Sequence, residues 1–475
     1  MPMEQAVPVA APEAAADTPA HGAEMRTLIA IAAPIAAGFF AELAMNFTDT
    51  LIIGRNVGSL ALGAVGLSAN LLFSRIFVCT AVISMVGAFA AQARGAGDRK
   101  AISHTVRQGF WVATLLSVPA TVLGLNLAPV LAWLDQDPAV VAFADQYLGG
   151  VAWCFLPYMW FTVLRNFVTA LARSTSVMVI TAAAIGLNFA LVYPLVTGRF
   201  GLPALGVAGA GIGTSIVCWV MFAALALHVA RSRAFREYRI FHDLLRLDLA
   251  LCGRILRFGL PAAGTSAAET GLFVAVQLLM GYVGVIALAA NQVAYTFQGM
   301  AFMFPAAMKE AATARVGFAF GRGSMPSARR SGLVAIGLSV GYMAVIAVVL
   351  WTFPETIASL FLGAGDPDAT QVLPLAATLL SIGAFFQIVD GIQITAMGAL
   401  RGINDTVVPF WLGLIGYWGI GLTSGVVLAF ALDHGAVGLW WGLALGLAAS
   451  AMLLAWRFHG RSRALIARPP VRLPA

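Results

Sequence analysis

The sequence predicts an all-α polytopic membrane protein of twelve transmembrane helices, arranged as two repeated halves of six. Composition is the first reason: of the 475 residues, 60% are hydrophobic and only 10% are charged, whereas soluble domains carry about 25% charged residues. The second reason is the length of the apolar runs. Phe258–Tyr282, for example, contains a single carboxylate, Glu269, near its middle. A run of this length and composition is typical of a membrane-spanning helix.

Six spans are expected in each half, and turn-forming sequences such as GRNVGS, DQDP and GAGDPD separate several of them. Residues 1–25 are rich in Ala, Pro and Glu and lack the basic start of a signal peptide, so they are expected to be a disordered tail. The expected domains are an N-terminal lobe (26–230), a basic linker (231–250), a C-terminal lobe (251–456) and a basic C-terminal tail (457–475). The expected spans are 27–53, 61–92, 107–133, 143–170, 176–197, 205–230, 251–282, 286–314, 332–353, 372–399, 407–431 and 436–456.

The distribution of Lys and Arg predicts the orientation in the membrane. If the N-terminus is cytoplasmic and the spans alternate, most of the 28 Lys and Arg residues fall in cytoplasmic segments, and the outer loops hold only Arg55 and Arg199. We therefore expect a multi-pass protein of a bacterial-type inner membrane with both termini in the cytoplasm. Arg401 is expected to close the tenth span at that face. Lys309 and Glu310 are expected to lie near the cytoplasmic end of the eighth span and to snorkel or pair locally.

The two halves of the chain repeat each other. Pro34 and Glu42 correspond to Pro261 and Glu269, and the sequence VGSLAL at 57–62 corresponds to VGVIAL at 283–288. All matches share an offset of about 230 residues, which indicates a duplicated six-helix unit. Because each half has an even number of spans, the halves should be related by an axis normal to the membrane.

Among the carboxylates inside predicted spans, four are candidate functional acids: Glu42, Asp49, Glu269 and Asp390. An acid exposed to lipid costs ~2.5–3.5 kcal/mol on insertion scales. We therefore expect the four acids to face a shared polar interior, which is usually a transport pathway. Glu42, Asn46 and Asp49 have the spacing of one helix face. Carboxylates there can bind a proton or Na⁺, although a purely structural pairing with Arg75 or Arg165 is the alternative.

Glu269 and Asp390 have no basic residue near them in their own spans, which favours binding of a proton or Na⁺. No other metal and no cofactor is expected. Asn188 is a candidate neighbour of Asp49, or else a helix–helix hydrogen-bonding residue. The four cysteines show no CxxC spacing and are expected to be small core residues.

Phe and Met side chains are candidates for an adaptable apolar surface that binds drugs. The candidates are Phe302, Met303, Phe385 and Phe386. Ordinary helix packing is the alternative for each of them.

Three stretches together resemble the multidrug and toxic compound extrusion (MATE) transporters, most closely the NorM-like branch. They are PIAAGFFAELAMNFTDTLIIG, AANQVAYTFQGMAFMFPAAM with ARVG, and IVDGIQITAMGALRGIND. The resemblance implies two six-helix lobes around a central cavity, and export of amphipathic, often cationic, drugs in exchange for Na⁺ or H⁺. It places Asp49, Glu269 and Asp390 on the family's functional acids. Glu42 stands where the family commonly has Gln, Phe386 replaces a frequent Tyr, and Val192 stands where a related branch has Asp.

Three classes of function follow as hypotheses. The first is a monomeric secondary antiporter whose partners are small-molecule drugs and the bilayer, with no nucleic acid. The sequence contains no GxxxxGK[ST] motif for ATP. The second is an exporter of a lipid-linked sugar, which needs a basic cavity for phosphates. The third, an intramembrane enzyme, is disfavoured because no HExxH pairing occurs.

Overall fold

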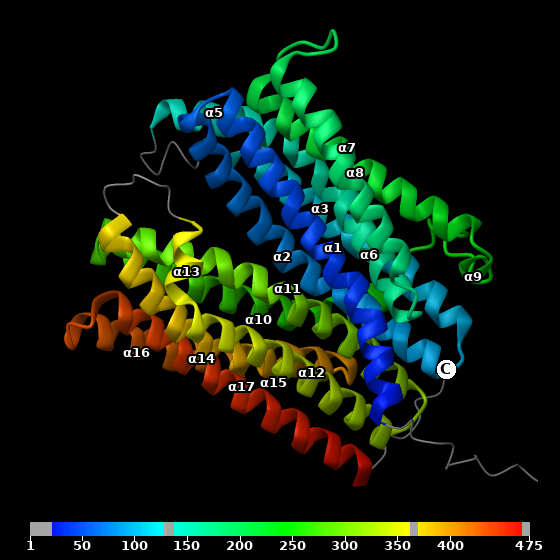
Figure 1. Ribbon diagram of the computed structural model, residues 1–475. Helices are drawn as coiled ribbons and strands as arrows, with labels where there is room; N and C mark the ends of the chain where they lie inside the picture. The colour runs from blue at the N-terminus through cyan, green and yellow to red at the C-terminus, as the bar shows by residue number, and fades with distance from the viewer. Residues whose placement is uncertain (1–20, 128, 130–136, 362–368, 468–475) are drawn as a thin grey trace, which may run out of the picture.

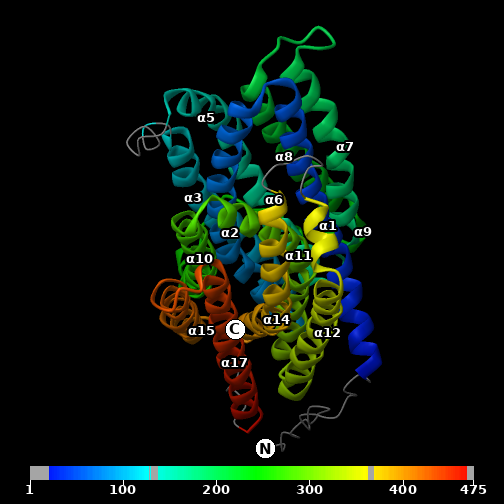
Figure 2. The ribbon, with the colours of Figure 1, turned by 60° about the vertical axis from the view of Figure 1, so that its left-hand side comes forward.

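The computed structural model describes residues 21–127, 129, 137–361 and 369–467. The described residues form helices joined by turns and contain no β-strand. Two bundles of helices, one from each half of the chain, make up the molecule (Figures 1 and 2). The predicted all-α, two-lobed membrane fold is therefore confirmed.

Helices from the first half of the chain form the N-terminal lobe, and helices from the second half form the C-terminal lobe. The N-terminal lobe consists of α1 (His21–Asn56), α2 (Ser59–Gly95), α3 (Arg99–Leu125), α5 (Pro138–Val151), η1 (Ala152–Cys154), α6 (Phe155–Ala170), α7 (Thr175–Thr197) and α8 (Gly206–Arg231), followed by the short α9 (Arg233–Arg236). The C-terminal lobe consists of α10 (Leu249–Val283), α11 (Val285–Gly321), α12 (Met325–Thr352), α13 (Pro354–Ser359), α14 (Ala369–Gly402), α15 (Val407–Leu414), η2 (Ile415–Leu422), α16 (Thr423–Val426), η3 (Val427–Ala431) and α17 (Gly435–Ala467).

The first and last helices are longer than predicted. Helix α1 begins at His21, inside the segment predicted to be disordered, because Glu24 is held by an ion pair with Arg315 (2.6 Å) and by the Ser331 hydroxyl (2.7 Å). Helix α17 continues through residues predicted as tail. The remainder of both predicted tails, and residues 128 and 130–133 of the third predicted span, lie outside the described residues.

The fourth predicted span contains a break in the α-helix. Helices α5 and α6 meet at the single 3₁₀ turn η1, just before Pro157. Proline lacks an amide hydrogen and its ring clashes with the carbonyl four residues earlier, so a tighter turn at this position avoids the conflict.

Glycines allow the eleventh span to pack closely on α17. Gly438, Gly442 and Gly446 form a small-residue stripe on α17, and a Cβ on Gly442 would lie 2.3 Å from the Gly425 Cα. Backbones can approach this closely only where side chains are absent. The facing span is wound partly as π-helix in η2 and η3.

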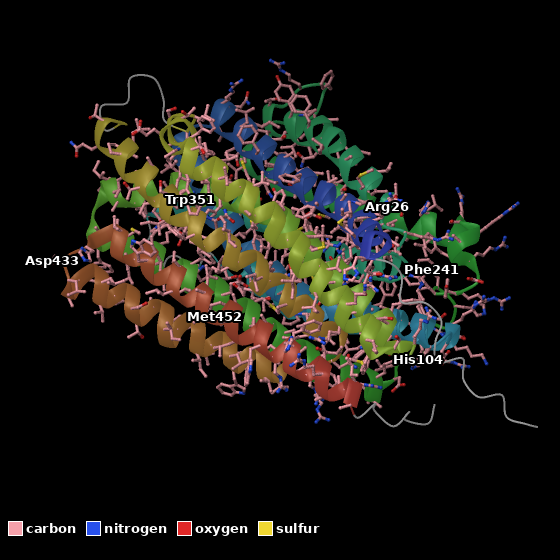
Figure 3. All side chains as sticks on the ribbon, turned by 60° about the horizontal axis from the view of Figure 1, so that its bottom comes forward. Arg26, His104, Phe241, Trp351, Asp433 and Met452 are labelled. Atoms are coloured by element: carbon pink, nitrogen blue, oxygen red, sulfur yellow. The ribbon has the colours of Figure 1, made fainter. Side chains whose placement is uncertain are left out.

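The lobes are in contact at one end of the molecule and diverge at the other (Figures 1 and 2). Near the closed end, Cβ atoms on Gly95 and Gly321 would lie 2.0 and 1.9 Å from backbone oxygens of Phe318 and Gln92, respectively. The Gln92 amide also donates to the Gly402 carbonyl (2.9 Å). Figure 3 places Arg26 and His104 toward the closed end and Asp433 toward the open end.

Eleven helices of the described part are long and apolar enough to cross a membrane, and α11 is not among them. It occupies the position of the eighth predicted span, but it carries polar residues such as Asn291, Gln298 and Lys309, all of them buried. Asn291 accepts a hydrogen bond from Trp440 of its own lobe (2.9 Å), whereas Lys309 lies over the Phe77 ring of α2, against which α11 also packs. Helix α11 thus belongs to the centre of the molecule.

Candidate functional site

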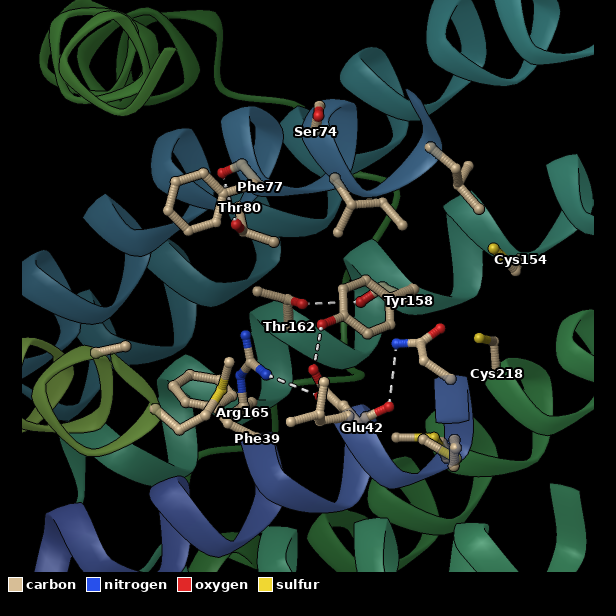
Figure 4. Close-up of a pocket in the computed structure, with 18 of the residues that line it drawn as sticks. Phe39, Glu42, Ser74, Phe77, Thr80, Cys154, Tyr158, Thr162, Arg165 and Cys218 are labelled. Carbon is tan, nitrogen blue, oxygen red and sulfur yellow. Dashed lines mark hydrogen bonds and ion pairs between the residues drawn. The ribbon is translucent and has the colours of Figure 1, made fainter. Parts of the chain in front are cut away.

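A cavity of about 470 Å³ lies between the lobes (Figure 4). Helices α1, α2, α6 and α8 supply most of its wall, and α10, α11 and α14 supply residues from the other lobe. Aromatic and Met side chains line it together with charged groups. The charged residues on its surface are Glu42, Asp49, Arg165, Lys309, Glu310 and Arg401.

Glu42 forms a buried ion pair on the cavity wall. Its Oε1 lies 3.3 Å from Arg165 Nη1, and the Tyr158 hydroxyl donates to its Oε2 at 3.0 Å (Figure 4). The Arg165 guanidinium also lies 5.3 Å from the centre of the Phe39 ring. This geometry favours the structural alternative for Glu42, because the charge of Arg165 already balances its carboxylate.

Asp49, in contrast, forms no ion pair within the described part of the chain. The Thr214 hydroxyl donates to its Oδ2 at 3.0 Å, while its Oδ1 is buried and has no hydrogen-bond partner. Asn188 lies close enough to interact with the Asp49 carboxylate, as predicted. The Asn46 amide instead donates to the Glu42 backbone carbonyl (3.1 Å). Asp49 is therefore a cavity acid that no cation of the described residues balances.

Glu269 and Asp390 lie in the interior of the C-terminal lobe. They are 5% and 6% exposed, respectively, and neither is among the described residues that line the cavity. The prediction that all four acids face one shared interior is thus wrong. Helical spacing shows which residues share a face of one helix, but it does not show whether that face turns to the central cavity or into the helix's own lobe.

Three unpaired oxygen atoms gather around these two acids. The Gln393 amide donates to Glu269 Oε1 (3.2 Å) and to the Tyr417 hydroxyl (2.6 Å). Glu269 Oε2, Asp390 Oδ1 and Gln393 Oε1 are buried acceptors that receive no hydrogen bond from any described residue. Oxygen atoms of this kind suit Na⁺ or a proton. The sequence analysis missed Gln393, although it lies nearly one helical turn after Asp390.

Lys309 pairs with Glu310 and Arg401 lies in the last turn of α14, both as predicted, but neither side chain reaches the surface. Both line the cavity and are 7% and 2% exposed, respectively. Lys309 does pair locally, with its Nζ 3.9 Å from Glu310 Oε1, but it does not snorkel to the surface. Arg401 Nη1 reaches Ser84 Oγ of the other lobe at 3.4 Å. Positive charge near the end of a span predicts a surface position only where the lipid boundary, rather than a second lobe, surrounds that end.

The apolar candidates divide into two groups. Phe302 and Met303 line the cavity as predicted. Phe385 is 51% exposed and packs on Trp351 and Trp441, whereas Phe386 is buried against Trp440. Neither of these two lines the cavity, so their assignment to it is wrong. Their spacing on α14 is that of neighbours, and neighbouring helical residues point in different directions.

Comparison with known sequences identifies close relatives across most of the chain. The MatE family profile matches residues 34–194 and 261–427. A probable multidrug resistance protein NorM from Rhodopseudomonas palustris is 41% identical over 450 residues, covering 95% of this chain and 94% of that protein. Multidrug resistance protein NorM from Burkholderia vietnamiensis is 39% identical, covering 92% of this chain and 94% of that protein.

Solved structures with the same architecture are more distant in sequence. The eukaryotic MATE transporter AtDTX14 superposes with a TM-score of 0.83 at 20% identity, covering 95% of this chain and all of that chain. An outward-facing multidrug resistance MATE family transporter of the MOP superfamily superposes with a TM-score of 0.82 at 18% identity, covering 93% of this chain and 96% of that chain. At these identities the likeness establishes the fold.

Proposed function

Because this chain belongs to the MatE family of multidrug and toxic compound extrusion transporters, we propose that it is a secondary active multidrug efflux carrier. It exports amphipathic, often cationic, compounds in exchange for inward movement of Na⁺ or H⁺. The observation that carries the proposal is Asp49, a cavity acid with a buried, unpaired oxygen and no ion-pair partner within the described residues.

The cavity supports binding of amphipathic compounds. Phe39, Phe77, Phe302 and Met303 provide apolar surface, and Asp49 provides a charge for a cationic group. Such a combination binds by apolar contact and uses few polar groups for orientation. Cations also interact favourably with the faces of aromatic rings.

The coupling ion is proposed to bind at Glu269, Asp390 and Gln393, whose unpaired oxygens lie apart from the cavity. The drug cavity lies between the lobes and the proposed ion site lies inside one of them, so we propose that exchange involves movement of one lobe against the other. Contact between the lobes at one end only is consistent with a rocking motion that alternates access. The closed end carries Arg26 and the basic helix α9, and we call it the Arg-rich end. We infer that this end faces the cytoplasm of a bacterial-type inner membrane and that both termini lie there.

The experiment compares wild type with Asp49→Asn, Glu269→Gln and Asp390→Asn in everted vesicles. Ethidium or norfloxacin transport is followed while the Na⁺ and pH gradients are varied independently. We expect each substitution to reduce gradient-driven transport by at least tenfold, since each removes a charge from a buried site. Retention of full gradient-driven transport in all three variants would exclude the proposed coupling.

Export of a lipid-linked sugar is a second candidate, because Arg165, Lys309 and Arg401 line the cavity and phosphate groups bind cations. Two of these cations are accompanied by a carboxylate, Glu42 and Glu310, respectively. This neutralisation favours the drug carrier. Accumulation of lipid-linked oligosaccharide in a deletion strain, with unchanged drug sensitivity, would reverse the preference.

A further inference from the structure

Lys309 is a buried cation placed between the two lobes. Its Nζ lies 3.9 Å from Glu310 Oε1 and 5.6 Å from the centre of the Phe77 ring on α2. A carboxylate and a ring face both attract an ammonium group, while the nearby Arg401 guanidinium repels it. Helix α11, which carries Lys309, packs closely against α14, the helix that carries Asp390. Lys309 therefore connects the drug cavity with the proposed cation site.

Close helix packing fixes the position of Lys309. A Cβ on Gly398 would lie 2.3 Å from the Lys309 carbonyl oxygen and 2.9 Å from its Cγ, so α14 and α11 meet at this residue. The Thr313 hydroxyl lies 2.9 Å from both the Lys309 and the Gly398 carbonyls. Helix α14 also carries Asp390 and Arg401, so the amine belongs to a cluster held by two packed helices.

Arg401 supplies the second fixed positive charge of this cluster. It reaches the Ala262 carbonyl at 3.3 Å and the Ser84 and Ser266 hydroxyls at 3.4 and 3.5 Å. Within the described residues it forms no ion pair with a carboxylate. Guanidinium stays protonated in proteins, so Arg401 contributes one positive charge whichever ion is bound nearby.

The charge cluster, defined as Glu269, Lys309, Glu310, Asp390 and Arg401, carries a formal excess of one negative charge. Three of its members are carboxylates and two are cations. Uncompensated charge is costly in a low-dielectric interior. One monovalent cation at Glu269 and Asp390 would neutralise the cluster, and a second would leave it positive.

We propose that Lys309 is the built-in counter-cation of this cluster and limits the C-terminal lobe to one coupling cation per transport cycle. The inference rests on the proposed function, since it concerns the same cation site. Removing the Lys309 amine adds one negative charge to the excess, so that two cations can bind. Removing the Glu310 carboxylate abolishes the excess, so that no cation is needed. Removing both returns the cluster to its original formal charge.

The test uses purified full-length protein, with and without reconstitution into proteoliposomes. Bound cations are counted in the substrate-free protein, by equilibrium binding of radioactive sodium and by the infrared intensity of protonated carboxyl groups. Cations exchanged per ethidium are then measured from the cation gradient that just balances a set ethidium gradient. Lys309→Met should double the number of cations bound at the C-terminal lobe and the number exchanged per ethidium. Lys309→Arg, which keeps the charge, should leave them unchanged.

The charge-restoring variant makes the test specific. Glu310→Gln should lose the coupling cation, and the double variant Lys309→Met/Glu310→Gln should recover the wild-type count. A wild-type count in Lys309→Met, or no recovery in the double variant, would overturn the proposal. If Lys309→Met does not fold, Glu310→Gln and the double variant still decide the question.

The two proposals fail in different ways. Ethidium transport by wild type that is independent of both gradients would refute the antiport function. The binding counts would still be measured, and equal counts in wild type, Lys309→Met, Glu310→Gln and the double variant would refute the role of Lys309 alone.

Discussion

At the scale of single residues, two acids on one helix face have different surroundings. Glu42 and Asp49 both line the cavity, but Glu42 has Arg165 and Tyr158 as partners, whereas Asp49 has Thr214 and Asn188. A charge that is already balanced has little need of an incoming ion. Substitutions of Glu42 and of Asp49 should therefore differ in their effects on stability and on transport.

Glu42→Gln should lower stability more than it lowers cation coupling. The substitution leaves the Arg165 guanidinium without its carboxylate, which costs about 1–3 kcal/mol in a partly buried pair. We expect a lower Tm in detergent and an unchanged dependence of ethidium transport on the cation gradient.

Asp49→Asn is the matched control for this prediction. It should change the Tm little, because Thr214 can still donate to the amide oxygen, and it should reduce transport. A Glu42→Gln variant that keeps its Tm but loses gradient dependence would show that Glu42 is itself a coupling acid.

At the scale of helices, glycine determines how closely the eleventh span approaches α17. Gly442→Ala should destabilise the C-terminal lobe, because its Cβ would collide with the backbone of Gly425 at 2.3 Å and no side-chain rotation can relieve that contact. We expect a loss of roughly 1–3 kcal/mol, typical of overpacking, visible as a lower Tm.

Gly419→Ala, in the eleventh span that faces α17, provides the comparison. Its Cβ would meet only Ile415 Cγ2, at 3.9 Å. Equal Tm values for the Gly442 and Gly419 variants would contradict the close approach of the two backbones.

The first turn of α10 depends on a carboxylate in the linker. Asp248 accepts hydrogen bonds from the Ala250 and Leu251 amides and lies 2.8 Å from His104 Nε2. The hydrogen bond to His104, followed by those to the backbone, holds the pKa of Asp248 below its usual value. A lowered carboxyl pKa contributes stability above the ordinary pKa, and this contribution is lost as pH falls through the folded-state pKa.

Asp248→Asn should therefore reduce the Tm at neutral pH and have a smaller effect in acid. Asn can still cap the helix, but it has no carboxyl group to titrate. The substitution therefore removes the pH-dependent part of the stability that Asp248 contributes. The difference in Tm from wild type should shrink between about pH 6 and about pH 3. A difference that stays constant over this range would rule out a titrating interaction at Asp248.

At the scale of the whole molecule, backbone contacts hold the lobes together at the Arg-rich end. Gly321→Ala should favour separation there, because its Cβ would lie 1.9 Å from the Gln92 carbonyl oxygen of the other lobe. Cavity access can be followed with Cys154 and Cys218, which line the cavity (Figure 4), in a Cys79→Ala/Cys252→Ala background.

We expect Gly321→Ala to increase labelling of these cysteines by an impermeant maleimide applied from the Arg-rich side. Gly337→Ala is the control, since a Cβ there meets no atom within 4 Å. Unchanged sidedness of labelling in Gly321→Ala would mean that this contact does not hold the lobes together.

Much of the fold could be predicted from the sequence because its signals are local. Long apolar runs with few charges specify membrane helices wherever they occur, and the repeated Pro and Glu of the two halves specify the duplication. Helix α11 shows the limit of this reasoning: its position was predicted, as the span 286–314, but no pattern in the sequence indicated what buries its polar residues. The neighbouring helices that bury them are known only from the tertiary structure.

The sequence by itself determined the membrane class, the two six-helix halves and the identity of the intramembrane acids. Only the tertiary structure decided that Arg165 neutralises Glu42, that Glu269 and Asp390 face their own lobe, and that Lys309 and Arg401 lie in the cavity. The physical reason is that desolvation makes an isolated charge in the membrane detectable in the sequence. Its partner comes from a distant helix, and only the packing of the lobes brings the two together.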